Sequence, residues 1–240
     1  LLKRMGQERE AIKNLDQVIR MGSYPDSLLL IRAVLQRNTG NPEQAIADLS
    51  TYISRHPSEK DPRQLRARLL MEDSAYQQAM QDLDHLIDVL KIKDNADLYH
   101  LRGLAQIRSG RPGDATGDLS RASALDRGND EHILLRAEAY AAMGNENAAL
   151  ADYRRLIRLG STDPRPWLAR AKFYMDRKRW DLALDDLNEG IKAQSTAEGH
   201  YQRAICWYEL KEEKKACADL RAAAELGHTE AARQIKSYCR

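Results

Sequence analysis

Six arginine residues recur along the chain, and an aspartate follows each of them at the same distance. If the arginine is residue i, the aspartate is residue i+16 in every case. In a helical hairpin whose turn lies midway, residues at this separation face each other, and a guanidinium and a carboxylate can then form two parallel hydrogen bonds. The expected pairs are Arg32–Asp48, Arg66–Asp82, Arg102–Asp118, Arg136–Asp152, Arg170–Asp186 and Arg203–Asp219. We predict a structural role for these pairs. A ladder of anion-binding sites is the less favoured alternative, because each arginine already has a carboxylate partner.

Other residue types that carry chemistry lack the spacing that the chemistry needs. The three cysteines do not have metal-ligand spacing, and the six histidines include no i,i+4 pair. Residues 109–113, Ser-Gly-Arg-Pro-Gly, lack the Lys-Ser/Thr pair of a phosphate-binding loop. No carboxylate stands alone in a predicted apolar cleft, so acid–base catalysis has no candidate residue. The sequence therefore predicts a protein that is not an enzyme and that uses no metal or cofactor.

The arginines also mark an internal repeat that would position these side chains. They stand at positions 32, 66, 102, 136, 170 and 203, so the interval between them is nearly constant and is longest from Arg66 to Arg102. A small residue follows each arginine at once, and residue i+13 is always alanine. Small side chains let two helices approach closely, and a large residue after each aspartate would fill the space between neighbouring hairpins. These large residues are Leu49, Leu83, Leu119, Tyr153, Leu187 and Leu220.

On these residues the sequence resembles the tetratricopeptide repeat (TPR) family, whose unit is a 34-residue helix–turn–helix. The resemblance implies an all-α fold: a right-handed superhelical solenoid of antiparallel hairpins with a C-terminal cap helix. The turn glycine of the family is present at Gly40, Gly110 and Gly144. The corresponding positions are Ser74, Lys178 and Lys211 in the other units.

The period divides the chain into one continuous array. We expect the second half of a truncated unit at 1–25, where Gly6 forms the turn, and a cap helix at 229–240 that Thr229 caps. Complete units are expected at 26–59, 60–95, 96–129, 130–163, 164–196 and 197–228. The unit at 60–95 is irregular, because it lacks the turn glycine and carries two extra residues. A local change of superhelical pitch is expected there.

The resemblance also implies a partner-binding groove. In TPR proteins a stripe on the first helix of each unit lines a concave groove that holds ligand peptides. The matching residues are Leu30, Val34, Arg68, Met71, His100, Leu104, Ile107, Leu134, Glu138, Leu168, Lys172, Met175, Tyr201 and Tyr208. So many apolar residues favour a protein or peptide as the ligand, with Arg68, Glu138 and Lys172 setting its register. The alternative is that some of these side chains pack between adjacent first helices.

Composition narrows the class of partner. The chain has 38 basic and 36 acidic residues, so its formal net charge is +2. This balance gives no electrostatic case for nucleic acid or an anionic membrane surface. No apolar run approaches the ~18 residues of a membrane span. We predict a non-catalytic scaffold or adaptor that binds a peptide or helical segment of another protein. The alternatives are the regulatory TPR portion of a larger enzyme or sensor and, more remotely, repeat-type RNA binding.

The cysteines bear on the cellular compartment. Cys217 and Cys239 are equally distant in sequence from His228, which lies at the expected turn before the cap helix. Antiparallel helices would bring them to the same level, so they form either a disulfide or two reduced thiols. A disulfide would indicate an oxidising compartment. Cys206 is expected to be a core thiol. The C-terminal pattern is also similar to that of exported bacterial TPR proteins, which favours the bacterial periplasm, with the cytoplasm as the alternative.

Overall fold

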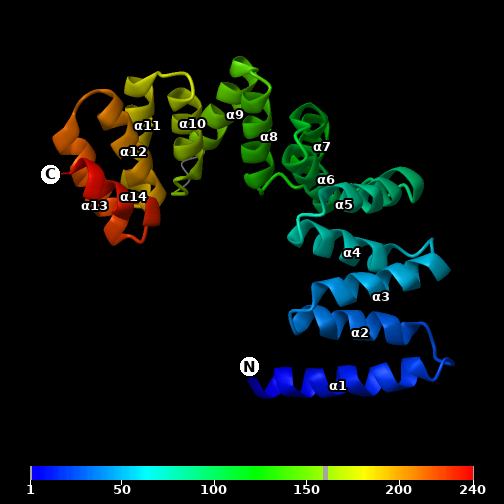
Figure 1. The fold of residues 1–240 in the computed structure, drawn as a ribbon. Coiled ribbons are helices and arrows are strands. Elements are labelled where there is room, and N and C mark those ends of the chain that lie inside the picture. The colour runs from blue at the N-terminus through cyan, green and yellow to red at the C-terminus, as the bar shows by residue number, and fades with distance from the viewer. Residues whose placement is uncertain (1, 159–161, 240) are drawn as a thin grey trace. The chain divides into compact units, whose positions relative to one another are not determined.

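The computed structural model describes residues 2–158 and 162–239, and every regular element in these ranges is a helix (Figure 1). Contacts divide the chain into two compact units, Leu1–Gly128 and Asn129–Arg240. Each unit is built from antiparallel helical hairpins. The predicted all-α repeat class is thereby confirmed, whereas the repeat boundaries and the continuity of the array remain our proposal.

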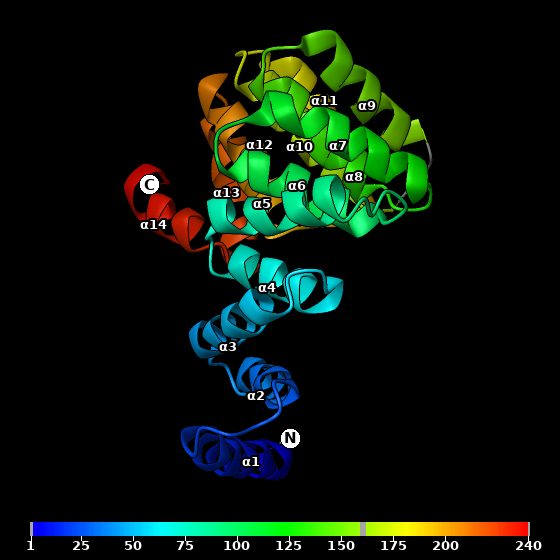
Figure 2. The ribbon, with the colours of Figure 1, turned by 90° about the vertical axis from the view of Figure 1, so that its right-hand side faces the viewer.

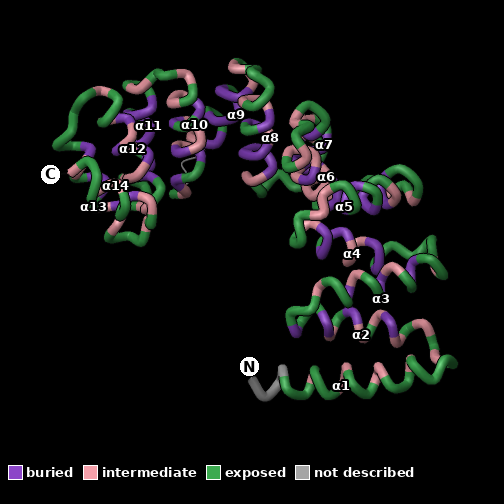
Figure 3. The backbone as a smooth tube through the Cα atoms, in the orientation of Figure 1, coloured by how far each residue is buried: buried purple, intermediate pink, exposed green. Residues whose placement is uncertain are grey.

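The first unit contains three hairpins preceded by a single helix. Its helices are α1 (Leu2–Arg20), α2 (Ser27–Asn38), α3 (Pro42–Arg55), α4 (Lys60–Glu72), α5 (Tyr76–Asp84), α6 (Ala96–Arg108) and α7 (Pro112–Leu125). The hairpins are α2–α3, α4–α5 and α6–α7. Figure 2 shows α1 to α4 stacked in chain order. Figure 3 shows buried residues on α2 to α5, whereas none of residues 6–20 of α1 is buried.

The second unit contains three hairpins followed by a single helix. Its helices are α8 (Glu131–Ala142), α9 (Glu146–Arg158), α10 (Arg165–Met175), α11 (Trp180–Ala193), α12 (Ala197–Glu209), α13 (Glu213–Glu225) and α14 (Thr229–Tyr238). The hairpins are α8–α9, α10–α11 and α12–α13, and α14 packs on α13. Because α14 follows the last hairpin directly, it covers an apolar face that a further hairpin would otherwise cover.

Small residues at the helix crossings explain why the hairpins pack so closely. Ala33, Ala45 and Leu49 are fully buried in the first complete hairpin. In the α6–α7 hairpin, Gly103 takes the place of the small residue that is alanine in the other hairpins. A Cβ atom there would lie 2.8 Å from Leu119 Cγ, which is closer than carbon atoms approach without displacement. The crossing therefore depends on the absence of a side chain at residue 103.

The turns inside the hairpins share one backbone conformation. Gly40, Gly110 and Gly144 have φ angles of 79°, 74° and 73°. Ser74, Lys178 and Lys211, which replace glycine in the other hairpins, have φ angles of 60°, 56° and 65°. In all six turns the next amide N–H donates to a carbonyl five residues earlier, as Asn41 N–H does to Gln36 O at 2.8 Å. This left-handed helix ending is the Schellman motif. The repeat thus imposes a left-handed residue even where the sequence lacks glycine.

Two sequence expectations about helix ends were wrong. Gly6 makes no turn, because α1 runs through it from Leu2 to Arg20. A glycine inside a helix costs only about 0.5–1 kcal/mol, and the residues around Gly6 are good helix formers without proline. Thr229 is not the N-cap of α14 either. His228 occupies that position, and its Nδ1 accepts a hydrogen bond from Ala231 N–H at 3.2 Å.

The irregular α4–α5 unit accommodates its two extra residues after α5, at two places. After α5, residues His85–Val89 form a π-helical turn, in which Leu90 N–H donates to His85 O at 2.9 Å. A π turn accommodates one additional residue within a helix. The chain then leaves through Lys91, which has a φ of 56°. Leu86 and Ile87 remain buried in the core of the unit, so the insertion widens the backbone and leaves the packed face in place.

Candidate functional site

All six arginine–aspartate pairs are present in the structure, and each is bidentate. The arginine Nε and Nη2 donate to the two carboxylate oxygens of the aspartate, at distances from 2.5 to 2.8 Å. The aspartates are buried, whereas the arginines keep part of their surface exposed. The pairs join the two helices of each hairpin.

Several of these arginines have a second partner that the repeat pattern did not predict. In Arg32, Arg66, Arg102 and Arg203 the remaining nitrogen, Nη1, reaches an acceptor in the preceding repeat. Arg32 Nη1 donates to Asp16 at 2.7 Å, Arg66 Nη1 to Ser50 at 2.9 Å and Arg203 Nη1 to Asn188 at 2.9 Å. Arg102 Nη1 donates to both Asp84 and Asp88, at 3.0 and 2.9 Å. The sequence signal was available: Ser50, Asp84 and Asn188 each stand two residues after the aspartate of the preceding repeat.

Burial acts against ionisation within one of the pairs. The pKa of Asp186 is raised, because desolvation outweighs the lowering by the hydrogen bonds from Arg170. Desolvation is the largest single effect on Arg170 and lowers its pKa, but the hydrogen bonds and the Coulombic attraction of Asp186 together raise the pKa above its ordinary value. The geometry favours the ion pair, because both bonds are short and parallel. We therefore treat Asp186 as ionised near neutral pH.

The stripe assigned to the groove contains an open hollow in the second unit. It has a volume of about 320 Å³ and lies between α8 and α10. The predicted groove residues Glu138 and Lys172 both line it. The other lining residues are Ala141, Ala142, Tyr153, Ala169, Phe173, Asp176 and Arg177. The arrangement presents small and aromatic side chains framed by charges of both signs.

Two residues assigned to the groove surface are instead part of the core. Leu134 is 6% exposed and lies in the cluster that contains Tyr153 and Leu156. Leu168 is 9% exposed and extends over Gly190, where a Cβ atom would lie 2.7 Å from Leu168 Cδ1. Leu168 packs inward because Gly190 has no side chain to block it. For these two positions, packing between helices was the correct alternative.

The remaining stripe residues differ in how far they are exposed. In the first unit, Val34 and Arg68 are exposed, and Arg68 pairs with Asp97 at 2.9 Å. The other five residues of that unit are half-buried: Leu30, Met71, His100, Leu104 and Ile107. In the second unit, Met175 is half-buried against the α10–α11 core. Exposed apolar surface on this stripe is therefore smaller than the sequence suggests.

The last two stripe residues face the cap helix. Tyr201 stacks on His228 with ring centroids 4.0 Å apart, and its hydroxyl accepts a hydrogen bond from Gln234 at 3.0 Å. Tyr208 meets the ring of Tyr238 edge-on at 5.4 Å. The α14 helix thus occupies part of the surface that Tyr201 and Tyr208 would offer to a ligand.

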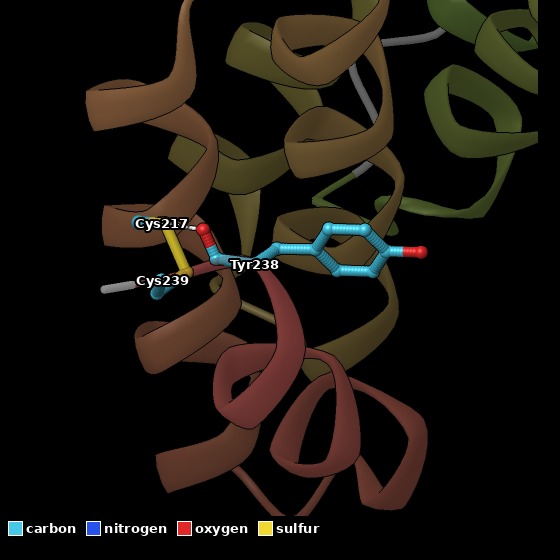
Figure 4. Close-up of a disulfide and its surroundings, with 3 residues drawn as sticks. All are labelled: Cys217, Tyr238 and Cys239. Carbon is cyan, nitrogen blue, oxygen red and sulfur yellow. Dashed lines mark hydrogen bonds between the residues drawn. A yellow bond between two sulfur atoms is a disulfide. The ribbon is translucent and has the colours of Figure 1, made fainter.

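A disulfide joins the cap helix to the last hairpin. Cys217 and Cys239 are bonded, with their Cα atoms 5.6 Å apart (Figure 4). Figure 4 also shows Tyr238 beside this bond, with its carbonyl oxygen 3.8 Å from Cys217 Sγ. Cys206 is a fully buried thiol, and burial raises its pKa to about 12. Cys206 is therefore protonated and unreactive near neutral pH.

A further constellation escaped sequence analysis. Ser195 Oγ lies 3.0 Å from His200 Nε2, and His200 Nδ1 lies 2.9 Å from Asp219 Oδ1. The order of groups is that of a nucleophilic serine triad. However, Asp219 is already bound by Arg203 through both oxygens, and Ser195 is exposed to solvent. We interpret the contacts as fixing the loop before α12 to the Arg203–Asp219 pair.

Within residues 2–158 and 162–239 no helix is long and apolar enough to cross a bilayer. In the same part of the chain no three His, Cys, Asp or Glu side chains gather as metal ligands would.

Comparison with known proteins supports the repeat architecture. A family model described as tetratricopeptide repeat matches residues 28–58. The bovine DnaJ homolog subfamily C member 3 is 24% identical over 220 residues, which is 85% of this chain but 42% of the relative. The chain thus spans less than half the length of that relative. A TPR protein structure from Parabacteroides merdae superposes with a TM-score of 0.71 at 20% identity, covering 97% of this chain and 91% of the other.

A second solved structure is that of YrrB, described as a TPR protein with an unusual peptide-binding site. It superposes with a TM-score of 0.53 at 15% identity, over 79% of this chain and 97% of YrrB. The chain thus shares the helical-repeat fold of these structures, and its residues 28–58 match the tetratricopeptide-repeat family model. Its bacterial origin stays a prediction, since the DnaJ homologs found are vertebrate proteins.

Proposed function

We propose that the chain is a non-catalytic interaction module that binds a peptide or helical segment of another protein. The observation that carries this proposal is the hollow between α8 and α10, which Glu138 and Lys172 line at positions assigned from the repeat. The alanines Ala141, Ala142 and Ala169 offer a ligand small apolar contacts, and the charged lining residues would fix its orientation. Hollows with this division of roles are typical of ligand sites. The peptide-binding site ascribed to YrrB is further support by analogy.

The charges around the hollow indicate how a peptide would be held. Lys172 and Arg177 are cationic, whereas Glu138 and Asp176 are anionic. A bound segment of mixed charge would place its own acidic residue near Lys172 and a basic residue near Glu138. Such pairs at a rim contribute more to orientation and association rate than to affinity. Arg177 already stacks over Phe173 at 3.6 Å from the ring centroid, so its guanidinium is pre-positioned.

The test begins with peptides selected for binding to the wild-type chain from a random library. Their affinity is then measured for Lys172→Glu and for the control Lys192→Glu. Lys192 is a well-exposed lysine on α11 and does not line the hollow. Charge reversal in the hollow should weaken binding about tenfold, whereas the control should leave it unchanged. Equal binding by all three proteins would exclude this hollow as the site.

A second candidate is that this array serves as the partner-binding portion of a longer polypeptide. The DnaJ homologs favour it, because the matching region is 42% of their length. An immunoblot of the native source with an antibody raised against the chain would give the mass of the native protein and so decide between the two candidates. A native protein near 27.3 kDa, the mass of this chain, would count against the second candidate.

A further inference from the structure

The Arg170 pair differs from the other pairs at its third nitrogen. Arg170 binds Asp186 through Nε and Nη2 at 2.8 and 2.5 Å, as the other arginines bind their aspartates. Elsewhere, the residue two positions after the preceding aspartate offers an oxygen to Nη1, as Ser50 and Asn188 do. For Arg170 that position is Arg154. A cation therefore stands where the repeat supplies an acceptor.

A cavity opens at this place. It has a volume of about 490 Å³ and is lined by Ala151, Arg154, Ile157, Arg158 and Arg170. Three of the five lining residues carry guanidinium groups, and none of the five carries a carboxylate. The cavity shares no residue with the hollow at Glu138 and Lys172. Its two elements, α9 and α10, belong to the second unit.

The immediate surroundings favour an anion. Arg154 and Arg158 are one helical turn apart on α9, so their side chains lie on the same face. Arg170 is held in place by Asp186, with only 17% of its side chain exposed. Guanidinium groups offer planar pairs of N–H donors that match the oxygens of phosphate. Asp186 compensates the charge of Arg170. An oxyanion would therefore chiefly relieve the repulsion between Arg154 and Arg158, and it could accept from Nη1 of Arg170.

We propose that Arg154, Arg158 and Arg170 form a binding site for a phosphate-class oxyanion. Its source is either a phosphorylated side chain of a protein partner or free inorganic phosphate. A phosphate monoester carries about 1.5 to 2 negative charges near neutral pH and three acceptor oxygens, which suits three cationic donors. Ile157 and Ala151 would contact the apolar part of a phosphorylated side chain. The proposal concerns a different surface from the peptide-binding hollow and stands independently of it.

The first experiment is thermal unfolding of the full chain with phosphate replacing chloride at constant ionic strength. A ligand that binds the native state raises the melting temperature by mass action. The variants are Arg154→Ser, which places the residue found at Ser50, and the control Arg155→Ser. Arg155 is adjacent on α9 but does not line the cavity. Each variant removes one positive charge, so the two have the same net charge. The quantity compared is the phosphate-induced change in melting temperature of each protein, and differences in melting temperature without phosphate are disregarded.

We expect the shift in the wild type and in Arg155→Ser, and at least tenfold weaker phosphate binding in Arg154→Ser. The absence of a shift in the wild type would overturn the proposal. Equal losses in both variants would overturn it too, because they would indicate a general charge effect. Titration with a phosphoserine peptide and its serine counterpart then identifies the source. Tighter binding of the phosphopeptide than of inorganic phosphate points to a modified partner, and equal binding points to free phosphate.

Discussion

The arginine–aspartate pairs show how one spacing in the sequence specifies a repeated contact. In each pair the carboxylate is buried and the guanidinium bridges two helices. Removing one partner of such a pair is costly, because the other partner loses its hydrogen bonds in a poorly solvated place. We therefore expect these residues to contribute to stability.

Replacement of Asp152 by alanine should lower the free energy of unfolding by roughly 2 kcal/mol, because Arg136 loses both bonds of the pair. Urea denaturation followed by circular dichroism measures the change. The matched control is Glu189→Ala, which removes the exposed pair with Lys192 and should cost less than about 0.5 kcal/mol. Similar small losses for both variants would show that solvent screens the Asp152 pair.

At a left-handed turn residue, a substitution can raise stability, in contrast to the loss expected at Asp152. Lys178 has a φ of 56°, a conformation that costs a residue with a side chain about 1 kcal/mol relative to glycine. Lys178→Gly should therefore raise the melting temperature, whereas Gly144→Ala, at a φ of 73°, should lower it. A decrease for both substitutions would mean that the entropy of the unfolded chain outweighs the strain.

The ion pairs of Asp26 predict how stability changes at low pH. The hydrogen bonds from His56 and Arg55 hold the pKa of Asp26 below its usual range. The stabilisation is therefore complete above the unfolded pKa of about 4 and is lost as the pH falls through the lower folded value. Asp26→Asn should be less stable than the wild type near pH 6, and the difference should vanish in strong acid. A difference that does not change with pH would exclude the titration of Asp26 as its cause.

At the scale of elements, the repeat period predicted where hairpins form and which faces they bury. Ala79, Ala149 and Ala183, which occupy the same place in the repeat relative to its arginine, are fully buried. The period could not predict that Leu134 and Leu168 pack inward, since that depends on room left by neighbours such as Gly190. It also could not predict the π turn at His85–Val89, because the two extra residues fit a longer loop equally well.

A disulfide holds the cap helix α14 to the last hairpin. The Cys217–Cys239 disulfide closes a loop with a sequence separation of 22, and a loop of this size corresponds to about 3 kcal/mol. Cys239→Ser should increase amide hydrogen exchange in α14 while leaving α10 and α11 protected. Unchanged exchange in α14 would show that Tyr201 and Tyr208 hold the helix without the bond.

At the scale of the whole molecule, each compact unit has its own core. In repeat proteins stability is approximately a sum of local terms between neighbours. Leu49→Ala, at a fully buried position in the first unit, should cost about 2–5 kcal/mol. Hydrogen exchange should rise in α2 to α5 and stay unchanged in α11 to α13. An equal rise in both units would indicate a single cooperative fold.

The π turn after α5 has a consequence for how such arrays change in length. Leu86 and Ile87 stay in the core although the segment around them carries an insertion. A widened turn at the end of a second helix can therefore accept a residue without shifting the apolar face of the next hairpin. Evolutionary insertions, and designed ones, should be tolerated there more readily than near Gly103, where the helices leave no space.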